Sequence, residues 1–243
     1  MTPYERLIGD VARWFLGVNE LSPRIVSFGG RLGYDDAGNS ANTQVVLHDY
    51  AAAPLIFETR GLPRSKEGQA NWGESMDKFR GSQVGVVVQC DDGYVLSTSS
   101  YDEVHAFDND GKEIKAWHGD GDHFANFIKA VRSRKRSDLN ADVLDGHLSS
   151  ALCHTGGISH QLGEPQAASD ILSSIKDNAL LRDSVERMFA HLRANEVNVD
   201  GPVVTQGVVL EMDPATERFT NNDAANELLR RKDRPQFVVP QVV

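Results

Sequence analysis

Two histidines seven residues apart carry the clearest chemical signal in the sequence. His147 and His154 lie in GHLSSALCH, a stretch with helical composition, so both side chains are expected on one helical face. Ser150 and Ala151 lie between them. Two histidines and small residues on one face are typical of a polar pocket wall, where an imidazole donates to a substrate hydroxyl or a leaving oxygen. The alternative for each is a hydrogen-bonded, half-buried helix histidine.

Two charged residues are further candidates for substrate contact. Asp10 lies in a predicted N-terminal helix and can accept hydrogen bonds from the hydroxyl groups of a ligand, and its alternative role is to pair with Arg13. Arg60 ends a predicted strand beside a long polar loop, where a guanidinium suits a polyol or an acidic sugar. Its alternative role is an ion pair with Glu58 or Asp77.

The motifs that bind common cofactors and metals are missing. The segment Phe28–Gly33 follows a predicted strand, but the dinucleotide fingerprint needs glycine at its first position and a helix after it. The segment Asp108–Gly111 resembles part of a calcium loop that lacks both terminal carboxylates. Cys90 and Cys153 match no zinc or redox spacing, and there is no G-x-S-x-G or H-E-x-x-H. We therefore expect no metal and no cofactor bound by this chain.

The chain is acidic, with 25 Lys plus Arg against 35 Asp plus Glu and a net charge of −10. Such a surface disfavours nucleic acid as a partner. The basic run at residues 129–136 ends a predicted helix, where cations favour the helix dipole. No stretch approaches the roughly 20 apolar residues that span a bilayer, and no leader sequence opens the chain. We expect no membrane partner and a cytoplasmic location, while an export signal on a part before residue 1 stays compatible with the sequence.

Hydrophobic periodicity divides the first half of the chain into one helix and several strands. A capping box with proline opens a helix at Thr2–Glu5, and apolar residues at helical spacing continue it to Gly17. A polar segment at residues 62–81 is expected to be a long loop. The predicted strands, rich in Val, Ile and Phe, are Pro23–Gly30, Thr43–Tyr50, Pro54–Gly61, Ser82–Cys90, Tyr94–Ser99, Glu103–Asp108 and Glu113–His118.

Helices dominate the second half. Two are predicted between Gly119 and Gly163, and one or two more over residues 167–194 with a break around residues 176–178. A strand or turn region at residues 202–213, a short helix over Ala215–Arg231 and an extended tail at Phe237–Pro240 follow. A helix, then strands, then helices indicates the α+β class. The short Asp- and Gly-containing links between strands favour antiparallel pairing. We expect an open, mainly antiparallel β-sheet with helices packed on one face.

Blocks spread along the chain resemble one protein family. DHFANFIKAVRSRK, LNAD and GHLSSALCH, within residues 119–163, resemble the C-terminal half of bacterial Gfo/Idh/MocA oxidoreductases. DVARWFLG at residues 10–17, the segment at residues 26–50, LIFETRGLP at residues 55–63, ERFTNNDAANELL at residues 217–229 and the FVVP tail resemble further blocks of the same branch. Agreement at so many separated blocks is not expected by chance.

The resemblance implies a domain organisation. Full-length relatives place a nucleotide-binding Rossmann domain before an open, mainly antiparallel sheet domain of the dihydrodipicolinate-reductase-like type. By this resemblance, residues 1–243 form a single C-terminal domain. Its expected parts are a sheet core at about 20–118, a helical part at about 121–195 and an extension at about 200–243. The Rossmann domain is expected to be absent from this chain.

The resemblance also implies a reaction. Relatives exchange hydride between NAD(P) and a hydroxyl carbon of a sugar, cyclitol or related polyol, with their Gly-rich loop and catalytic lysine in the Rossmann domain. Asp10 matches the acid of the family's H-x-x-D helix, but Leu7 occupies the histidine position and cannot accept a proton. We therefore expect NAD(P) in full-length relatives and no cofactor here. The chain is an oxidoreductase by resemblance that is not expected to catalyse the reaction alone.

Three functions stay open from the sequence. The first is the substrate-binding and oligomerisation domain of such an oxidoreductase, which contacts a sugar-like molecule and forms a homo-oligomer through its sheet face. The second is a non-enzymatic module that dimerises through the sheet or joins a separate Rossmann-domain subunit. The third is a cofactor-free sugar hydrolase or lyase, which needs two carboxylates facing one cleft.

Overall fold

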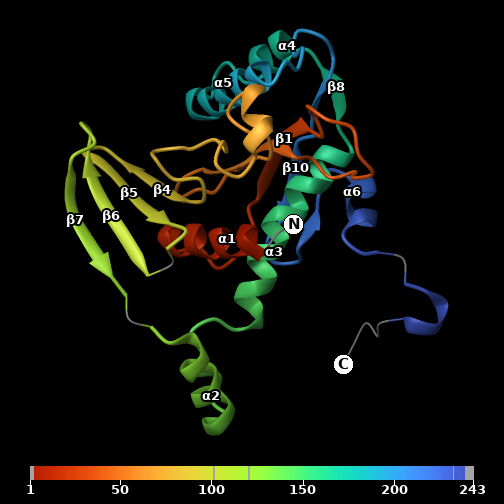
Figure 1. Ribbon diagram of the computed structural model, residues 1–243. Coiled ribbons are helices and arrows are strands. Elements are labelled where there is room, and N and C mark those ends of the chain that lie inside the picture. Colours follow the sequence, from red (N-terminus) through yellow and green to blue (C-terminus); the bar gives the residue numbers. More distant parts are fainter. Residues whose placement is uncertain (1–2, 101, 120, 232, 239–243) are drawn as a thin grey trace.

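Two antiparallel sheets organise the chain (Figure 1). The computed structural model describes residues 3–100, 102–119, 121–231 and 233–238, and side chains from residue 9 onward. One sheet has seven strands and the other has four. The larger sheet forms the core with helices from both ends of the chain, and the smaller sheet extends to one side of it.

The seven-stranded sheet is built around β1, which pairs antiparallel with β2, β9 and β10. Its main strand order is β11-β10-β1-β2-β3, and β8 joins through β9. The strands are β1 (Arg24–Gly30), β2 (Thr43–His48), β3 (Leu55–Arg60), β8 (Glu164–Gln166), β9 (Val204–Gln206), β10 (Leu210–Asp213) and β11 (Arg218–Phe219). Segments nearly two hundred residues apart therefore meet in one sheet.

Helices cover both faces of the central strands. Side chains alternate along a strand, so Val26 and Phe28 point to one face while Ile25 points to the other. The first face packs on α4 (Ala168–Ser174) and α5 (Ala179–Ala194). The second face packs on a long helix, α3 (Val143–Gln161), through residues such as Leu148 and Ile158. Each fully buried aliphatic or Phe side chain contributes about 1.5–3 kcal/mol to such a core.

The N-terminal helix α1 (Pro3–Leu16) packs on α3 through small residues. A Cβ added at Gly9 would lie 3.4 Å from the Cβ of Ser149, so the helices touch closely there. One face of α3 meets the sheet just as closely, because Gly156 lies against Val46. The capping box at the start of α3, made by Asp142 and Asp145, fixes where this helix begins.

The four-stranded sheet lies outside both hydrophobic cores. It comprises β4 (Gly85–Cys90), β5 (Gly93–Thr98), β6 (Glu103–Asp108) and β7 (Glu113–His118), paired in that order. Its side chains belong to neither of the two buried clusters formed by the described residues. The hairpin between β4 and β5 needs glycine at position 93, where φ is 157° and the Phe107 carbonyl leaves no room for a Cβ. Contacts with α1 at β4 join this sheet to the body.

Helix α2 (His123–Ser133) projects from the body between β7 and α3 (Figure 1). The Asp122 side chain caps its start by accepting from the Ala125 amide. Arg134, with φ of 58°, ends it in the left-handed conformation. Among the described elements, α2 makes its principal contacts with the short 3₁₀ segment η2 (Arg136–Asp138) that follows it.

The predicted α+β class and the open antiparallel pairing are confirmed, but the strands form two sheets where one was expected. The helices, however, are divided between both faces of β1 and β2, because the β1 and β2 side chains on both faces are apolar. The predicted helix over Ala215–Arg231 is wrong in its first part. Arg218 and Phe219 pair with β10, and the helix α6 (Asp223–Leu228) starts only after its cap at Asn222.

Two other segments differ from expectation in detail. The long loop contains a 3₁₀ turn, η1 (Glu67–Asn71), and the tail contains another, η3 (Pro235–Phe237). Val238 is extended as predicted, and residues 239–240 lie outside the described part of the chain. Within that part, no helix combines the length and apolar character that crossing a bilayer requires.

Candidate functional site

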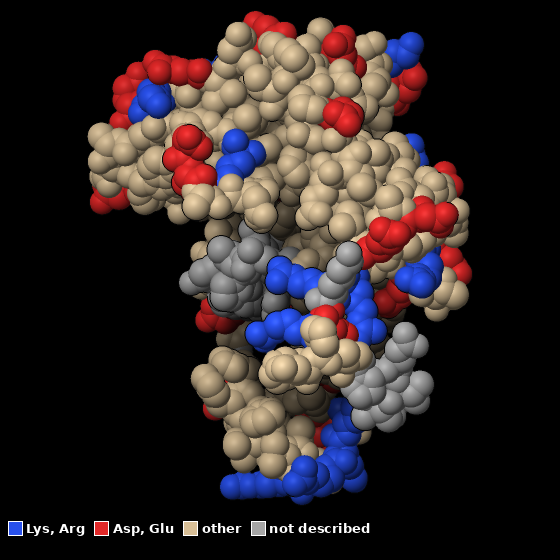
Figure 2. Space-filling view, turned by 90° about the vertical axis from the view of Figure 1, so that its right-hand side faces the viewer, with Lys and Arg blue, Asp and Glu red and all other residues tan. Residues whose placement is uncertain are grey.

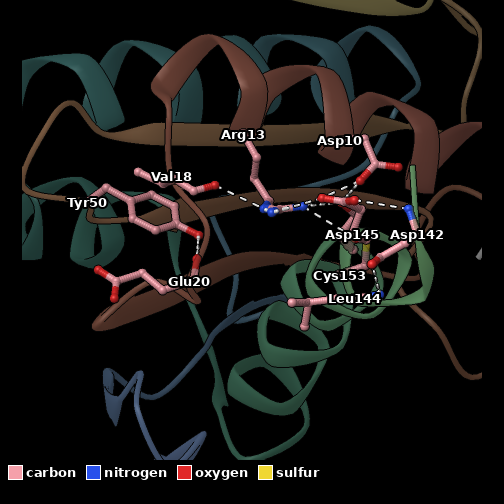
Figure 3. Close-up of polar contacts among 10 residues, drawn as sticks. Asp10, Arg13, Val18, Glu20, Tyr50, Asp142, Leu144, Asp145 and Cys153 are labelled. Atoms are coloured by element: carbon pink, nitrogen blue, oxygen red, sulfur yellow. Dashed lines mark hydrogen bonds and ion pairs between the residues drawn. The ribbon is translucent and has the colours of Figure 1, made fainter. Parts of the chain in front are cut away.

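Asp10 lies in the seam between α1 and α3, beside the buried guanidinium of Arg13 (Figure 3). Arg13 Nη1 lies 3.4 Å from Asp10 Oδ1 and 3.0 Å from the hydroxyl of Ser149. Ser149 donates to the same carboxylate oxygen. The alternative role of Asp10 as the partner of Arg13 is therefore realised.

Arg13 ties together three segments of the chain. Its side chain is fully buried, and it also donates to the backbone carbonyls of Asp145 at 3.3 Å and Val18 at 3.4 Å. Burial raises the pKa of Asp10 above its ordinary value, against the hydrogen bond from Ser149 and the charge of Arg13. Burial and the charge of Arg13 therefore act on the Asp10 carboxyl in opposite directions.

His147 and His154 share one face of α3, as their spacing predicts, but that face points to solvent. His147 Nε2 lies 2.7 Å from Glu217 Oε2, and the imidazole is half exposed. His154 is also exposed, whereas Leu152 and Thr155, which point in other directions from the helix, are buried. Ser149 follows His147 by two residues, so it lies nearly opposite on the helix and faces α1.

Arg60 lies at the end of β3 in a network of charges. It donates to Asp77 at 2.9 Å and to Glu58, so both alternative ion pairs are present. Burial acts to raise the pKa of Asp77, but the hydrogen bonds from Arg60 and the Lys78 amide hold it below its ordinary value. This network fastens the long loop to the sheet.

Two residues of α5 complete this network, and the sequence did not single them out. Arg187 donates to Glu58 and lies over the ring of Phe79, 4.7 Å from its centroid. His191 is buried, with Nδ1 3.3 Å from Asp77 but outside hydrogen-bond geometry. Burial lowers the pKa of His191 below its ordinary value, although Asp77 acts in the opposite direction. In the sequence, Arg187 and His191 lie four residues apart in a predicted helix, and this spacing places both side chains on one side of the helix.

The four candidate residues occupy three separate places. Asp10 is in the α1–α3 seam, Arg60 is at the loop end of β3, and the two histidines are on the outer face of α3. Their roles in substrate binding stay predictions. Within the described residues, no group of three or more His, Cys, Asp or Glu side chains is arranged to hold a metal ion.

Comparisons with known proteins add a distant structural likeness. No protein-family model matches the chain, and no curated protein matches its sequence. One similar solved structure is described as a "putative oxidoreductase from Klebsiella pneumoniae", with 13% sequence identity and a TM-score of 0.39. The match covers 62% of this chain and 45% of that one, so the chain spans less than half the length of that structure.

Proposed function

We propose that this chain is the substrate-binding and oligomerisation domain of an NAD(P)-dependent oxidoreductase acting on sugars, cyclitols or related polyols. The proposal assigns association to the four-stranded sheet, with a second copy as the partner. It leaves hydride transfer to a nucleotide-binding part, on this protein or on a separate subunit.

The observation that carries the proposal is an apolar sheet face that the described chain covers only in part. The pairing register places Val88, Val95 and Ala106 in one row across the sheet, with Val86 and Val104 in the next row. All five are only partly buried, although they are apolar. Ser97, between Val86 and Val104, is buried. On the opposite face Tyr94 and Leu96 are buried, and Arg80 lies over the ring of Tyr94 at 4.4 Å. An apolar face of this kind is stabilised by packing on another surface.

The sequence resemblance supports the oxidoreductase part of the proposal. Hydride transfer needs a bound nicotinamide and a proton acceptor near the reacting hydroxyl. Asp10, whose pKa burial raises above its ordinary value, is the carboxyl group in this chain that matches a family position. Arg60, His147 and His154 are proposed as hydroxyl contacts from surfaces that a second domain or subunit would have to close.

Association is tested by measuring molar mass with light scattering during size exclusion, across micromolar concentrations. We expect the wild-type chain to exceed its monomer mass of 26.7 kDa, and Val88→Glu to return it to that mass. The matched control Val203→Glu, at an exposed valine outside this sheet, should keep the wild-type mass. A wild-type chain that stays monomeric throughout would overturn the assignment of association to the sheet.

Calorimetric titration with NAD⁺, NADH, NADP⁺ and NADPH tests whether nucleotide binding belongs to another part or subunit. The proposal requires no binding to the isolated folded chain. Micromolar binding of any of these nucleotides would overturn this assignment and make the chain an autonomous oxidoreductase.

The cofactor-free hydrolase has one observation in its favour. Asp10 and Asp145, on facing helices, both lie against Arg13, and burial raises the pKa of Asp10 above its ordinary value. Release of free sugar from a nitrophenyl glycoside by the isolated chain, lost in Asp10→Asn, would favour this function over the first.

A further inference from the structure

Helix α2 presents an apolar face that the rest of the described chain leaves uncovered. Phe124, Phe127, Ile128 and Val131 recur at helical spacing and so share one side of the helix. Phe124 is 73% exposed and Phe127 is 58% exposed, and no residue of α2 is buried. Exposed aromatic residues grouped on one helix face are typical of a binding surface.

The arm, which we define as residues 123–138, is also strongly basic. It holds five basic residues against one acidic residue, a net charge of +4, in a chain of −10. Figure 2 shows Lys and Arg gathered at the lower tip of the molecule, where α2 lies in Figure 1. An open groove between α2 and η2 is lined by Phe124, Ile128, Lys129, Arg132 and Asp138. Its occupant must therefore combine apolar surface with negative charge.

The four-stranded sheet has this combination. Its apolar face carries the partly buried valines described above, and Trp117 on the edge strand β7 is 44% exposed. Residues 85–118 hold seven acidic residues against two basic residues, a net charge of −5. The segments that form the sheet and the arm therefore carry opposite net charges, with the basic Lys115 in the row of Val88, Val95 and Ala106. The apolar face of the arm is exposed, and that of the sheet is partly covered.

We propose that α2 of one copy packs across the apolar face of the four-stranded sheet in a second copy, in a reciprocal dimer. This inference rests on the proposed association through the sheet and names the element that covers it. A helix laid on a sheet face is the usual way in which both surfaces are buried. In its own chain, α2 continues away from β7 rather than returning over the sheet (Figure 1). A two-fold pair would bury two such contacts, one from each arm.

The first test changes only the arm. Phe124→Glu/Phe127→Glu alters two exposed side chains, so the fold should be retained. We expect its dimer dissociation constant to rise at least about a hundredfold, which gives the monomer mass at micromolar concentration. The control Phe237→Glu, at an exposed phenylalanine outside the arm, should leave the dimer unchanged.

The second test mixes two variants that are each expected to be monomeric by themselves. The arm variant retains an intact sheet, and Val88→Glu retains an intact arm, so an equimolar mixture can form one arm-to-sheet contact. We expect heterodimers in the mixture, weaker than the wild-type dimer. A mixture in which both proteins stay monomeric would overturn the proposed contact.

The outcomes separate this inference from the proposed function. If Val88→Glu dissociates the dimer while Phe124→Glu/Phe127→Glu does not, association through the sheet stands and the arm contact is wrong. If neither variant dissociates the dimer, both are wrong. Binding of a monomeric wild-type chain to phosphatidylglycerol–phosphatidylcholine vesicles, lost in the arm variant, would assign α2 to a bilayer surface and overturn the dimer.

Discussion

The buried side chain of Arg13 makes contacts that another residue type cannot replace. It is fully buried and holds Asp10, Ser149 and two backbone carbonyls across the α1–α3 seam. Arg13→Met should lower the free energy of unfolding by about 3–5 kcal/mol, because it leaves a partly buried carboxylate without its counter-charge. Urea denaturation followed by circular dichroism measures this loss.

The control for Arg13 is an arginine whose ion pair is exposed. Arg193 pairs with Asp200 at 3.0 Å, with both side chains more than half exposed. Arg193→Met should change the free energy of unfolding by about 0–1 kcal/mol. Equal losses in the two variants would contradict a structural role for the buried guanidinium.

The buried His48 makes the free energy of unfolding depend on pH. The imidazole is fully buried, and burial lowers its pKa from 6.5 to about 3. Below pH 6.5 the unfolded chain takes up a proton that the folded chain excludes, so stability falls from about pH 6.5 down to about pH 3. The slope from this residue is about 1.4 kcal/mol per pH unit.

The variant His48→Gln isolates this contribution. It has no titrating group at position 48, so its stability should fall less steeply between pH 6.5 and pH 3 than that of the wild type. His191 has a pKa shifted in the same direction and contributes to the slope that remains. Parallel stability curves for the two proteins would show that His48 does not titrate as its burial requires.

At the scale of elements, α3 offers a matched pair of adjacent glycines. A Cβ at Gly156 would lie 2.9 Å from both Cγ atoms of Val46, whereas a Cβ at Gly157 would meet nothing within 4 Å. Gly157→Ala should raise the free energy of unfolding by up to about 1 kcal/mol, since alanine favours the helix. Gly156→Ala should lower it by about 1–3 kcal/mol, because the core there is filled.

Thermal unfolding monitored at the helix band ranks these two variants. We expect the order Gly157→Ala, wild type, Gly156→Ala from the highest to the lowest melting temperature. A stabilised Gly156→Ala would mean that α3 and β2 are packed less closely than the 2.9 Å approach indicates.

The element boundaries that local chemistry determines were predictable from the sequence. The turn at Asp91–Gly93 and the cap at Asn178 separate elements that the structure contains. Phe219 was assigned wrongly because its strand exists only through pairing with Met212, and its neighbours on the chain resemble a helix. Pairing between distant segments overrides local preference there.

The ion pairs between candidate residues that are close in sequence were predictable, but the positions of the candidate residues relative to one another in the fold were not. Spacing along the chain was enough to suggest Arg13 for Asp10, and Glu58 for Arg60. Helical periodicity placed His147 and His154 on one face, but it does not determine whether that face meets solvent or the core. His191 contacts Asp77, which lies more than one hundred residues earlier in the sequence, and no sequence pattern predicts that contact.

At the scale of the whole molecule, the two sheets should differ in local stability. The strands β1 and β2 are enclosed between helices, whereas β4–β7 contribute to neither buried cluster among the described residues. Amide hydrogens of Val87 and Leu96 should therefore exchange at least about tenfold faster than those of Phe28 and Val45, because local opening costs less. Mass spectrometry at submicromolar concentration measures this, and equal protection in both sheets would contradict it.

The four-stranded sheet and the projecting helix are neighbours in sequence, since β4 begins at Gly85 and α2 ends at Ser133. If these two surfaces recognise one another between copies, both are inherited on one short stretch of gene. Recombination that exchanges this stretch as a block would transfer a self-compatible pair, whereas a crossover inside it would separate them. Paralogues that diverge in this stretch would then cease to mix, and a cell could keep two such proteins as separate populations.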